Sequence, residues 1–279
     1  MNEERKLTLQ EIHKFTLNNL KKIIEICDKL SINYFIAYGT LIGAARHEGF
    51  IPWDDDFDIM MLRPDYDKFC KYCIDNKAEL KQYKLVNRET DRQYPYNISR
   101  FCDTSFRMKR SDNVPVVEMG VFIDIYPLDG VGYNRGMKSK ILKMRKKVNM
   151  ILWDFSLTNQ YIAVNSNIIL SIAKAPIVLY THFRKMQYFL NKLDDLRKLY
   201  SYEKSEYVDC VVWGEISYPL KKELFLKYVF LDFEGIQVKV PIHWEQILTT
   251  IYGDYMKLPP IEKRVSSHDY ELYYKYDDN

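Results

Sequence analysis

Apolar residues in the first thirty positions recur at steps of three and four, which is the spacing of one face of a helix. This pattern predicts a helix over residues 8–31. Short apolar runs predict strands at 34–38 and 57–62, with a brief helix between them. Pro64 then predicts the start of a helix that runs to about Leu80, because the missing N–H of proline costs nothing in a first turn.

The middle and the end of the chain alternate between strand and helix patterns. Residues 83–126 are predicted to be mostly strands, and a turn at 128–130 is expected to end that block. Residues 135–200 are helical in character, and Glu234 and Gly235 form the predicted turn of a hairpin that a helix follows. Short strands mixed with helices indicate an α+β fold, a mixed sheet flanked by helices, and not a regular βαβ winding.

Composition narrows the class of protein. The chain has 279 residues, enough to bury a core without metal or disulfide staples, and its 47% of hydrophobic residues argues against wholesale disorder. The net charge is only +3, so a dedicated nucleic-acid-binding protein is not expected. Five cysteines make no paired framework, and the CxxC of Cys70 and Cys73 is expected to be buried structure and not a metal or redox site.

The segment with the clearest chemistry is a run of acids. Four carboxylates occupy five positions, at Asp54, Asp55, Asp56 and Asp58. Residues two apart on a strand face the same side, so Asp56 and Asp58 are expected to point together while Phe57 turns into the core. Two carboxylates on one face repel each other unless a cation lies between them, and such oxygen ligands suit Mg²⁺ or Mn²⁺. A solvated acidic loop is the alternative, although aromatic residues flank the run.

Two further features strengthen this prediction. Gly39 and Thr40 form a turn that opens the brief helix upstream, and backbone N–H groups at such a turn can bind a phosphate. Asp124 lies in a second apolar strand, where an unpaired charge is costly, so its carboxylate needs a partner. A metal shared with Asp56 and Asp58 would supply that partner; an internal arginine pair or a hydrogen bond at the strand end are the alternatives.

With these residues in place, the chain resembles the LicD family of phosphotransferases, which includes phosphorylcholine transferases of bacterial surface glycans and is related to fukutin-related protein. The matching stretches bracket nearly the whole chain: GTLIGAARHEGFIPWDDDFDI (39–59), GVFIDIYPLDG (120–130), FEGIQVKVPIHWEQILTTIYGDYMKLPP (233–260) and EKRVSSH (262–268). The resemblance implies a nucleotidyltransferase-like catalytic core. It also implies transfer of a substituted phosphate from a CDP-linked alcohol to a sugar hydroxyl.

The resemblance assigns roles by position. Asp56 and Asp58 match the metal-binding acids of the family, and Asp124 matches its third acid, a further metal ligand or a base toward the hydroxyl. The implied cofactor is Mg²⁺, or Mn²⁺ in its place. Candidates for binding the donor phosphates are the turn residues Gly39 and Thr40 and the basic residues Arg46, His47, Arg100, Lys263, Arg264 and His268. For each basic residue, a plain surface or salt-bridge role is the alternative.

The expected division of the chain follows from the same resemblance. We expect a nucleotidyltransferase-like catalytic core at 1–134, a helical subdomain facing the acceptor or a membrane at 135–215, and a hairpin and helix at 216–279 that complete the catalytic domain. The basic and apolar stretch 137–180 suits a helix lying on anionic lipid, with ordinary buried helices as the alternative. Without a signal-peptide core or an uninterrupted run of roughly 18 apolar residues, the expected location is the cytoplasm, with peripheral contact at the inner face of the cell membrane.

These observations together predict a metal-dependent transferase. The expected reaction moves phosphocholine from CDP-choline to a sugar hydroxyl of a cell-surface glycan, such as lipopolysaccharide or teichoic acid, or of its lipid-linked precursor, and releases CMP. The partners are then the CDP-linked donor and the sugar acceptor, and no nucleic acid. The alternatives are transfer of a polyol phosphate such as ribitol phosphate, a nucleotidyltransferase moving NMP to a small acceptor, a glycosyltransferase using a sugar nucleotide, and a non-catalytic interaction protein.

Overall fold

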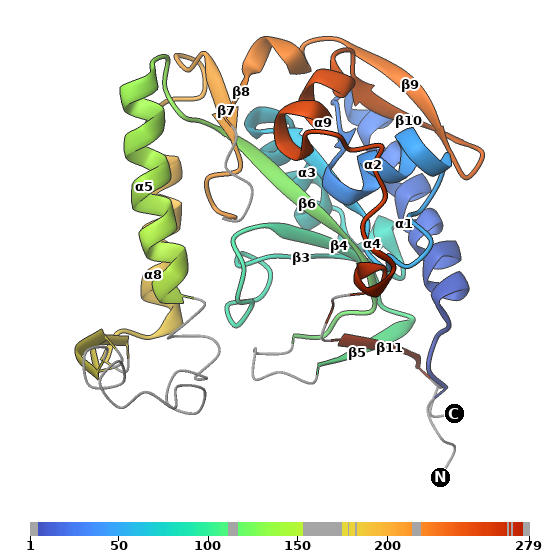
Figure 1. Ribbon diagram of the computed structural model, residues 1–279. Helices are drawn as coiled ribbons and strands as arrows, with labels where there is room; N and C mark the ends of the chain where they lie inside the picture. Colours follow the sequence, from blue (N-terminus) through green and yellow to red (C-terminus); the bar gives the residue numbers. More distant parts are fainter. Residues whose placement is uncertain are drawn as a thin grey trace.

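A mixed sheet forms the centre of the protein (Figure 1). The computed structural model describes residues 5–110, 117–152, 175–177, 179–181, 183–213, 219–266, 268 and 270–275. The strands of the main sheet are β1 (Phe35–Ile36), β2 (Asp58–Leu62), β3 (Tyr83–Val86), β4 (Ser99–Asp103), β6 (Val121–Gly130), β7 (Tyr207–Asp209) and β8 (Leu220–Lys221). Five of them follow in the order β1–β2–β6–β4–β3, while β7 pairs with the end of β6 and then with β8.

The sheet is mixed because β2 and β6 run parallel, whereas the other pairs are antiparallel. Two smaller antiparallel pairs flank it. They are β9 (Tyr228–Phe233) with β10 (Ile236–Pro241), and β5 (Phe106–Arg110) with β11 (Tyr270–Tyr274). The hairpin predicted to turn at Glu234 and Gly235 is thereby confirmed. The combination of short strands with helices confirms the α+β class.

Helices cover the sheet and its ends. They are α1 (Leu9–Leu30), α2 (Tyr38–His47), α3 (Arg63–Asp75), α4 (Lys77–Leu80), α5 (Arg135–Ile151), α8 (Met186–Arg197) and α9 (Trp244–Tyr252), with short 3₁₀ turns η2 (Lys222–Phe225) and η3 (Ile261–Lys263). A capping box begins α1: the Thr8 hydroxyl accepts from the Glu11 N–H, and the Glu11 carboxylate accepts from the Thr8 N–H. The sequence therefore predicted the first helix to within one residue at each end.

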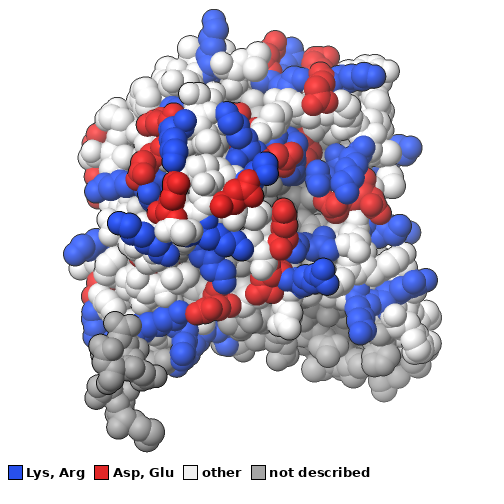
Figure 2. All heavy atoms as spheres, turned by 180° about the vertical axis from the view of Figure 1, so that it is seen from behind, with Lys and Arg blue, Asp and Glu red and all other residues white. Residues whose placement is uncertain are grey.

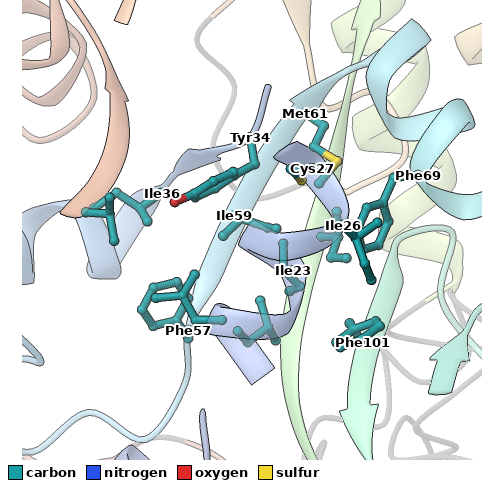
Figure 3. Close-up of a cluster of buried hydrophobic side chains, with 14 of the residues drawn as sticks. Ile23, Ile26, Cys27, Tyr34, Ile36, Phe57, Ile59, Met61, Phe69 and Phe101 are labelled. Carbon is teal, nitrogen blue, oxygen red and sulfur yellow. The ribbon is translucent and has the colours of Figure 1, made fainter. Parts of the chain in front are cut away.

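The alternation of side chains along the strands divides the core into two clusters. Ile59 and Ile123 face α1 and α3, and Figure 3 shows Ile23 and Ile26 of α1 in the same cluster as Ile59. The residues that follow them, such as Met60, belong to the cluster on the opposite face. Asp58 is one residue before Ile59 and Asp124 is one after Ile123, so both acids lie on that opposite face, together with the cluster of Met60 and Tyr126.

Three element boundaries differ from the sequence prediction. The strand predicted at 34–38 is only Phe35–Ile36, because Tyr38 takes a left-handed backbone conformation with φ of 48° and already begins α2. The helix predicted from Pro64 to Leu80 is interrupted at Asn76, between α3 and α4. The turn predicted at 128–130 is instead the end of β6, because β7 pairs with this part of the strand and extends it.

The helices α5 and α8 pack on each other beside the sheet (Figure 1). Ile141 of α5 and Leu190 and Leu193 of α8 share a separate apolar cluster. Residues 153–174, which make up half of the stretch expected to contact lipid, lie outside the described residues. The division of the chain at residues 135 and 215 stays a prediction.

Neither the cysteines nor the surface charge suggests another class of protein. All five cysteines are free and buried, including Cys70 and Cys73, as expected for structural residues. On the face seen in Figure 2, Lys and Arg are interspersed with Asp and Glu. Among the described residues, no helix combines the length and the apolar character needed to cross a membrane.

Candidate active site

The predicted acids come together on one face of the sheet. In the parallel pairing of β2 with β6, Asp58 lies directly opposite Asp124. The helix α2 is tied to the start of β2, since the Thr40 hydroxyl accepts a hydrogen bond of 2.8 Å from the Asp58 N–H. A Cβ atom on Gly39 would come within 3.1 Å of Asp54 Oδ2, so glycine allows the acidic loop to approach the first turn of α2. The turn at Gly39 and Thr40 thus positions the acids.

Asp58 is the most strongly perturbed of these acids. Its residue is 5% exposed, and its Oδ1 atom is buried without a hydrogen-bond partner among the described residues. Burial, followed by the charges of Asp56 and Asp124, raises the pKa of Asp58 well above its ordinary value. A buried carboxylate oxygen without a partner is costly, and a bound cation would remove that cost.

The strand predicted at 57–62 begins at Asp58, so Asp56 lies in the segment before β2. Phe57 between them is fully buried, so the expected alternation still holds. Burial, and next the charge of Asp54, raises the pKa of Asp56 to about 7. Asp56 and Asp58 therefore repel each other, as the sequence argument required of a cation site.

Asp124 has an arginine partner, one of the alternatives that the sequence left open. Arg100 on β4 lies opposite Asp124, and its Nε donates to Asp124 Oδ1 at 2.6 Å. The Arg100 guanidinium is buried between the rings of Tyr96 and Phe122, at 4.8 and 4.1 Å from their centroids. Arg100 thus lies next to Asp124 in the sheet, on the side away from Asp58. Binding of a donor phosphate by Arg100 stays a prediction.

His268 reaches the acids from the other end of the chain. Its Nδ1 lies 2.6 Å from Asp55 Oδ1 and its Nε2 lies 3.4 Å from Asp56 Oδ2. Burial lowers the pKa of His268, but the hydrogen bond to Asp55 and the charges of Asp56 and Asp55 outweigh it and raise the pKa to about 9. The sequence grouped His268 with the phosphate-binding candidates, and the structure places it against the acidic loop.

Two arginines gather near the acidic loop without a carboxylate partner. Arg46 of α2 bonds only to His47 and to the Tyr255 carbonyl, and Arg264 donates to the Pro259 carbonyl, among the contacts of the described residues. Burial, then the charge of Arg264, lowers the pKa of Arg46, so the two guanidiniums are close enough to repel each other.

The position of this arginine pair relates it to the acids. The Arg264 guanidinium lies 5.7 Å from the ring centroid of Trp53, the residue before the acidic run. Burial and the charge of Arg46 likewise lower the pKa of His47. Lys263 is exposed in η3, and no contact joins its side chain to the acids. Arg46, His47 and Arg264 thus form a basic group beside the acidic loop, and Lys263 is peripheral to it.

The sequence did not predict which tyrosines lie at the site, because the chain has 23 of them and no pattern separates one from another. Four residues on four elements surround the acids: Tyr38, Tyr126, Tyr252 and Tyr270. Burial, and next the nearby carboxylates, raises the pKa of Tyr270 well above its ordinary value, so its hydroxyl stays protonated. Tyr126 follows Asp124 on the same face of β6, and only that period-two spacing could have singled it out.

The acids fit a divalent metal by their chemistry, since carboxylate oxygens are the preferred ligands of Mg²⁺ and Mn²⁺. The unpartnered Oδ1 of Asp58 is the clearest sign of such a ligand. Among the described residues, one group of three potential ligand atoms lies within 4.8 Å of one another, and it consists of Asp54, Asp55 and His268. Among the same residues, the predicted set of Asp56, Asp58 and Asp124 does not form such a group.

We expect the metal-free protein to be more stable at about pH 5 than at about pH 8. Because the pKa of Asp56 is raised from 3.8 to about 7, the folded state holds a proton that the unfolded state has lost, and stability falls as pH rises through this range. The raised pKa of His268 acts in the same direction, since its contribution is complete below the ordinary 6.5 and is lost as pH rises through about 9. Melting temperatures in EDTA across this range measure the decline; a flat or rising profile would contradict these pKa directions.

The mixed sheet, with buried acids on two neighbouring strands, fits a phosphotransferase with a nucleotidyltransferase-like core. The family model described as "LicD/FKTN/FKRP, nucleotidyltransferase domain" matches residues 31–150. The chain is 30% identical to the lipopolysaccharide cholinephosphotransferase LicD of Haemophilus influenzae over 279 aligned residues, which cover 96% of this chain and 99% of that protein. The chain therefore belongs to the LicD family.

Shorter matches reach two rickettsial proteins. An uncharacterized protein of Rickettsia prowazekii is 31% identical over 109 residues, which cover 39% of this chain and 38% of that protein. An uncharacterized protein of Rickettsia typhi is 40% identical over 65 residues, which cover 23% of this chain and 19% of that protein. The family resemblance drawn from the motifs is thus confirmed, while the roles of the individual site residues stay predictions.

Proposed function

We propose that this protein transfers phosphocholine from CDP-choline to a sugar hydroxyl of a cell-surface glycan or its lipid-linked precursor, with Mg²⁺ or Mn²⁺ as cofactor. The observation that carries the proposal is the cluster of buried acids, in which Asp58 Oδ1 has no partner among the described residues. An arginine pair, Arg46 and Arg264, adds to it, and the Arg264 guanidinium lies over the ring of Trp53, next to the acidic run. A diphosphate donor with a bound metal ion suits this arrangement, because the acids can bind the metal and the arginines can bind the phosphates. The choice of phosphocholine and of a glycan acceptor rests on the full-length similarity to a lipopolysaccharide cholinephosphotransferase.

Each group of residues has a part in this reaction. Asp56 and Asp58 hold the divalent ion, which supplies charge neutralisation on the donor diphosphate. Both oxygens of Asp124 already accept hydrogen bonds from Arg100, at 2.6 and 3.4 Å, which favours a role as third ligand over a role as general base. Arg46 and Arg264 bind the phosphate oxygens and thereby stabilise the negative charge on the leaving CMP, because planar guanidiniums match the geometry of phosphates.

The transfer is an in-line displacement at phosphorus. The acceptor hydroxyl oxygen forms a bond to the phosphorus that bears choline, while the bond from that phosphorus to the CMP oxygen breaks. CMP leaves with the bonding electrons, and the hydroxyl gives its proton to water or to an acid of the loop. The work of the protein is positioning and charge stabilisation, as in other phosphoryl transfers.

The tyrosines offer a place for the choline head group. Quaternary ammonium groups bind to the faces of aromatic rings, and nearby carboxylates add to the attraction. Tyr126 packs edge-on against Tyr38 at 5.0 Å between centroids and lies 6.1 Å from Trp213. Burial, and then the charges of Asp58 and Asp56, raises the pKa of the Tyr252 hydroxyl, which places that ring beside the same acids.

A lipid-linked acceptor would bring the reaction to the inner face of the membrane. Met144 and Met150 of α5 are exposed, at 41% and 46%, on a helix rich in lysine. Exposed apolar side chains among basic ones suit contact with anionic lipid. We include peripheral membrane contact through α5 in the proposal on that ground.

Thermal stabilisation by a nucleotide panel tests the donor. The purified protein is heated with CDP-choline, CDP-ribitol, CDP-glycerol, CTP or a UDP-sugar, each with Mg²⁺ and again with EDTA. We expect CDP-choline with Mg²⁺ to raise the melting temperature most, and EDTA to abolish the effect, since a ligand of the folded state stabilises by RT ln(1 + [L]/Kd).

Other responses in the panel would redirect the assignment. Stabilisation by CDP-ribitol alone would make the transferred group a polyol phosphate. A response confined to CTP would favour a nucleotidyltransferase, and one confined to the UDP-sugar a glycosyltransferase. Stabilisation by CDP-choline that persists in EDTA would contradict the metal-held donor.

A further inference from the structure

Three charged side chains lie in a row across the sheet, one on each of three neighbouring strands. Asp58 on β2 is the register partner of Asp124 on β6, and Asp124 is the register partner of Arg100 on β4. The three residues are 5%, 6% and 6% exposed, respectively. Register partners on neighbouring strands point to the same face, so a buried cation stands at the end of a row of buried acids.

Asp124 and two aromatic rings hold Arg100 in this place, while its Nη1 atom is buried with no hydrogen-bond partner among the described residues. Its Nε and Nη2 atoms donate to the two oxygens of Asp124, and the rings of Tyr96 and Phe122 lie within 4.8 Å of its guanidinium carbon. Arginine keeps its charge at any physiological pH. A movement of Arg100 toward a substrate would leave Asp124 buried and unpaired, which is strongly unfavourable. Arg100 is therefore a permanent positive charge in the site.

We propose that Arg100 takes the place of a second divalent ion, so that this site works with a single ion held by Asp56, Asp58 and Asp124. Arg100 cancels the charge of one carboxylate of this row, as a second cation would. In two-metal sites the ions lie roughly 3.5–4 Å apart, so a second ion at Asp124 would lie against a guanidinium of the same sign.

The geometry leaves ligand atoms for that one ion. A carboxylate oxygen has about two lone-pair sites, so Asp124 can accept from Arg100 and still bind a metal. Asp58 offers its Oδ1 atom, which is buried and has no other partner among the described residues. Asp55 is not counted as a ligand, because its Oδ1 atom is already hydrogen-bonded to His268 Nδ1 at 2.6 Å. Arg100 is accordingly a positioning residue that sets the number of ions and the orientation of Asp124.

Counting bound Mn²⁺ tests this inference, which rests on the metal dependence of the proposed function. The metal-free full-length protein is dialysed against excess Mn²⁺, and bound metal per chain is measured by mass spectrometry and electron paramagnetic resonance. We expect one ion in the wild type and in Arg100→Lys, which keeps the charge. We expect two ions in Arg100→Met, which removes the charge but keeps an unbranched side chain.

Two controls locate the ion. Arg145 is another buried arginine, and its Nη1 atom pairs with Asp209 Oδ2 at 3.0 Å. A folded Arg145→Met variant should therefore still bind one ion. His268→Gln disrupts the group formed with Asp54 and Asp55, and it should also bind one ion.

Several results would overturn the inference. Two ions in the wild type, or one ion in a folded Arg100→Met variant, would show that Arg100 does not set the count. Loss of the ion in His268→Gln would move it to the group of Asp54 and Asp55. A wild type that binds no Mn²⁺ would refute metal dependence itself, and this inference with it. Two ions in the wild type would overturn the inference even where Arg100→Met fails to fold.

Discussion

Asp58→Asn is expected to abolish transfer while making the metal-free protein more stable. The asparagine keeps the shape of the side chain but removes a buried negative charge that burial, Asp56 and Asp124 all disfavour. That repulsion then no longer opposes folding, so the melting temperature in EDTA should rise. The loss of a metal ligand should lower kcat/KM by roughly 10³-fold or more, because the ion stabilises several kcal/mol of transition-state charge.

A buried acid farther along β6 provides the matched control. Asp129 is 2% exposed and pairs with Arg63 at 2.6 Å, so Asp129→Asn should destabilise the fold and leave kcat/KM of the folded protein close to that of the wild type. The two variants thus have opposite signatures in a melting assay and a transfer assay. An Asp58→Asn protein that retains activity within about tenfold would remove Asp58 from the metal site.

The arginine pair should account for the second largest effect. Replacing either Arg46 or Arg264 by glutamine removes a charge-assisted hydrogen bond to phosphate, worth about 1.5–3 kcal/mol, which is roughly 10–100-fold in kcat/KM. Most of the loss should fall on KM for the CDP-linked donor and not on KM for the acceptor. If both guanidiniums bind one diphosphate, the double variant should lose less than the product of the single effects.

Arg107→Gln is the control for that series, because Arg107 is an exposed arginine on β5, a strand that carries none of the acids. Its donor KM should match the wild type. Equal donor and acceptor effects in the Arg46 and Arg264 variants would argue that the pair supports the fold of the loop and not the phosphates. Fully multiplicative effects would argue that the two guanidiniums bind separate groups.

Much of this architecture could be predicted from local sequence signals. Helix α1 carries both its periodicity and its capping box, and the hairpin of β9 and β10 has its turn in Glu234 and Gly235. The acids were found for a similar reason: Phe57 and Ile59 are core residues, and the pattern of alternation places Asp58 on the other face. In each case the determining residues are neighbours in the chain.

Interactions between distant segments were not predictable in this way. The contact of Arg100 with Asp124 depends on the register of β4 with β6, which the sequence alone does not fix. The position of His268 depends on a segment 213 residues from Asp55, and nothing around His268 indicates that partner. Tyr38 was assigned to a strand because it ends the apolar run at 34–38, whereas in the fold it takes a left-handed conformation and begins α2.

The link between His268 and the acidic loop also has a consequence for the order in which the protein matures. The ribosome releases the chain from its N-terminus, so the acids emerge and can fold long before the histidine that faces them is synthesised. During that interval their mutual repulsion opposes the closing of the loop. The last strand, β11, pairs with β5 and meets Lys6 near the other end of the chain, and its docking delivers the histidine. The contact between the histidine and the acids is thus a late event of folding, which waits until β11 has been synthesised and has docked on β5.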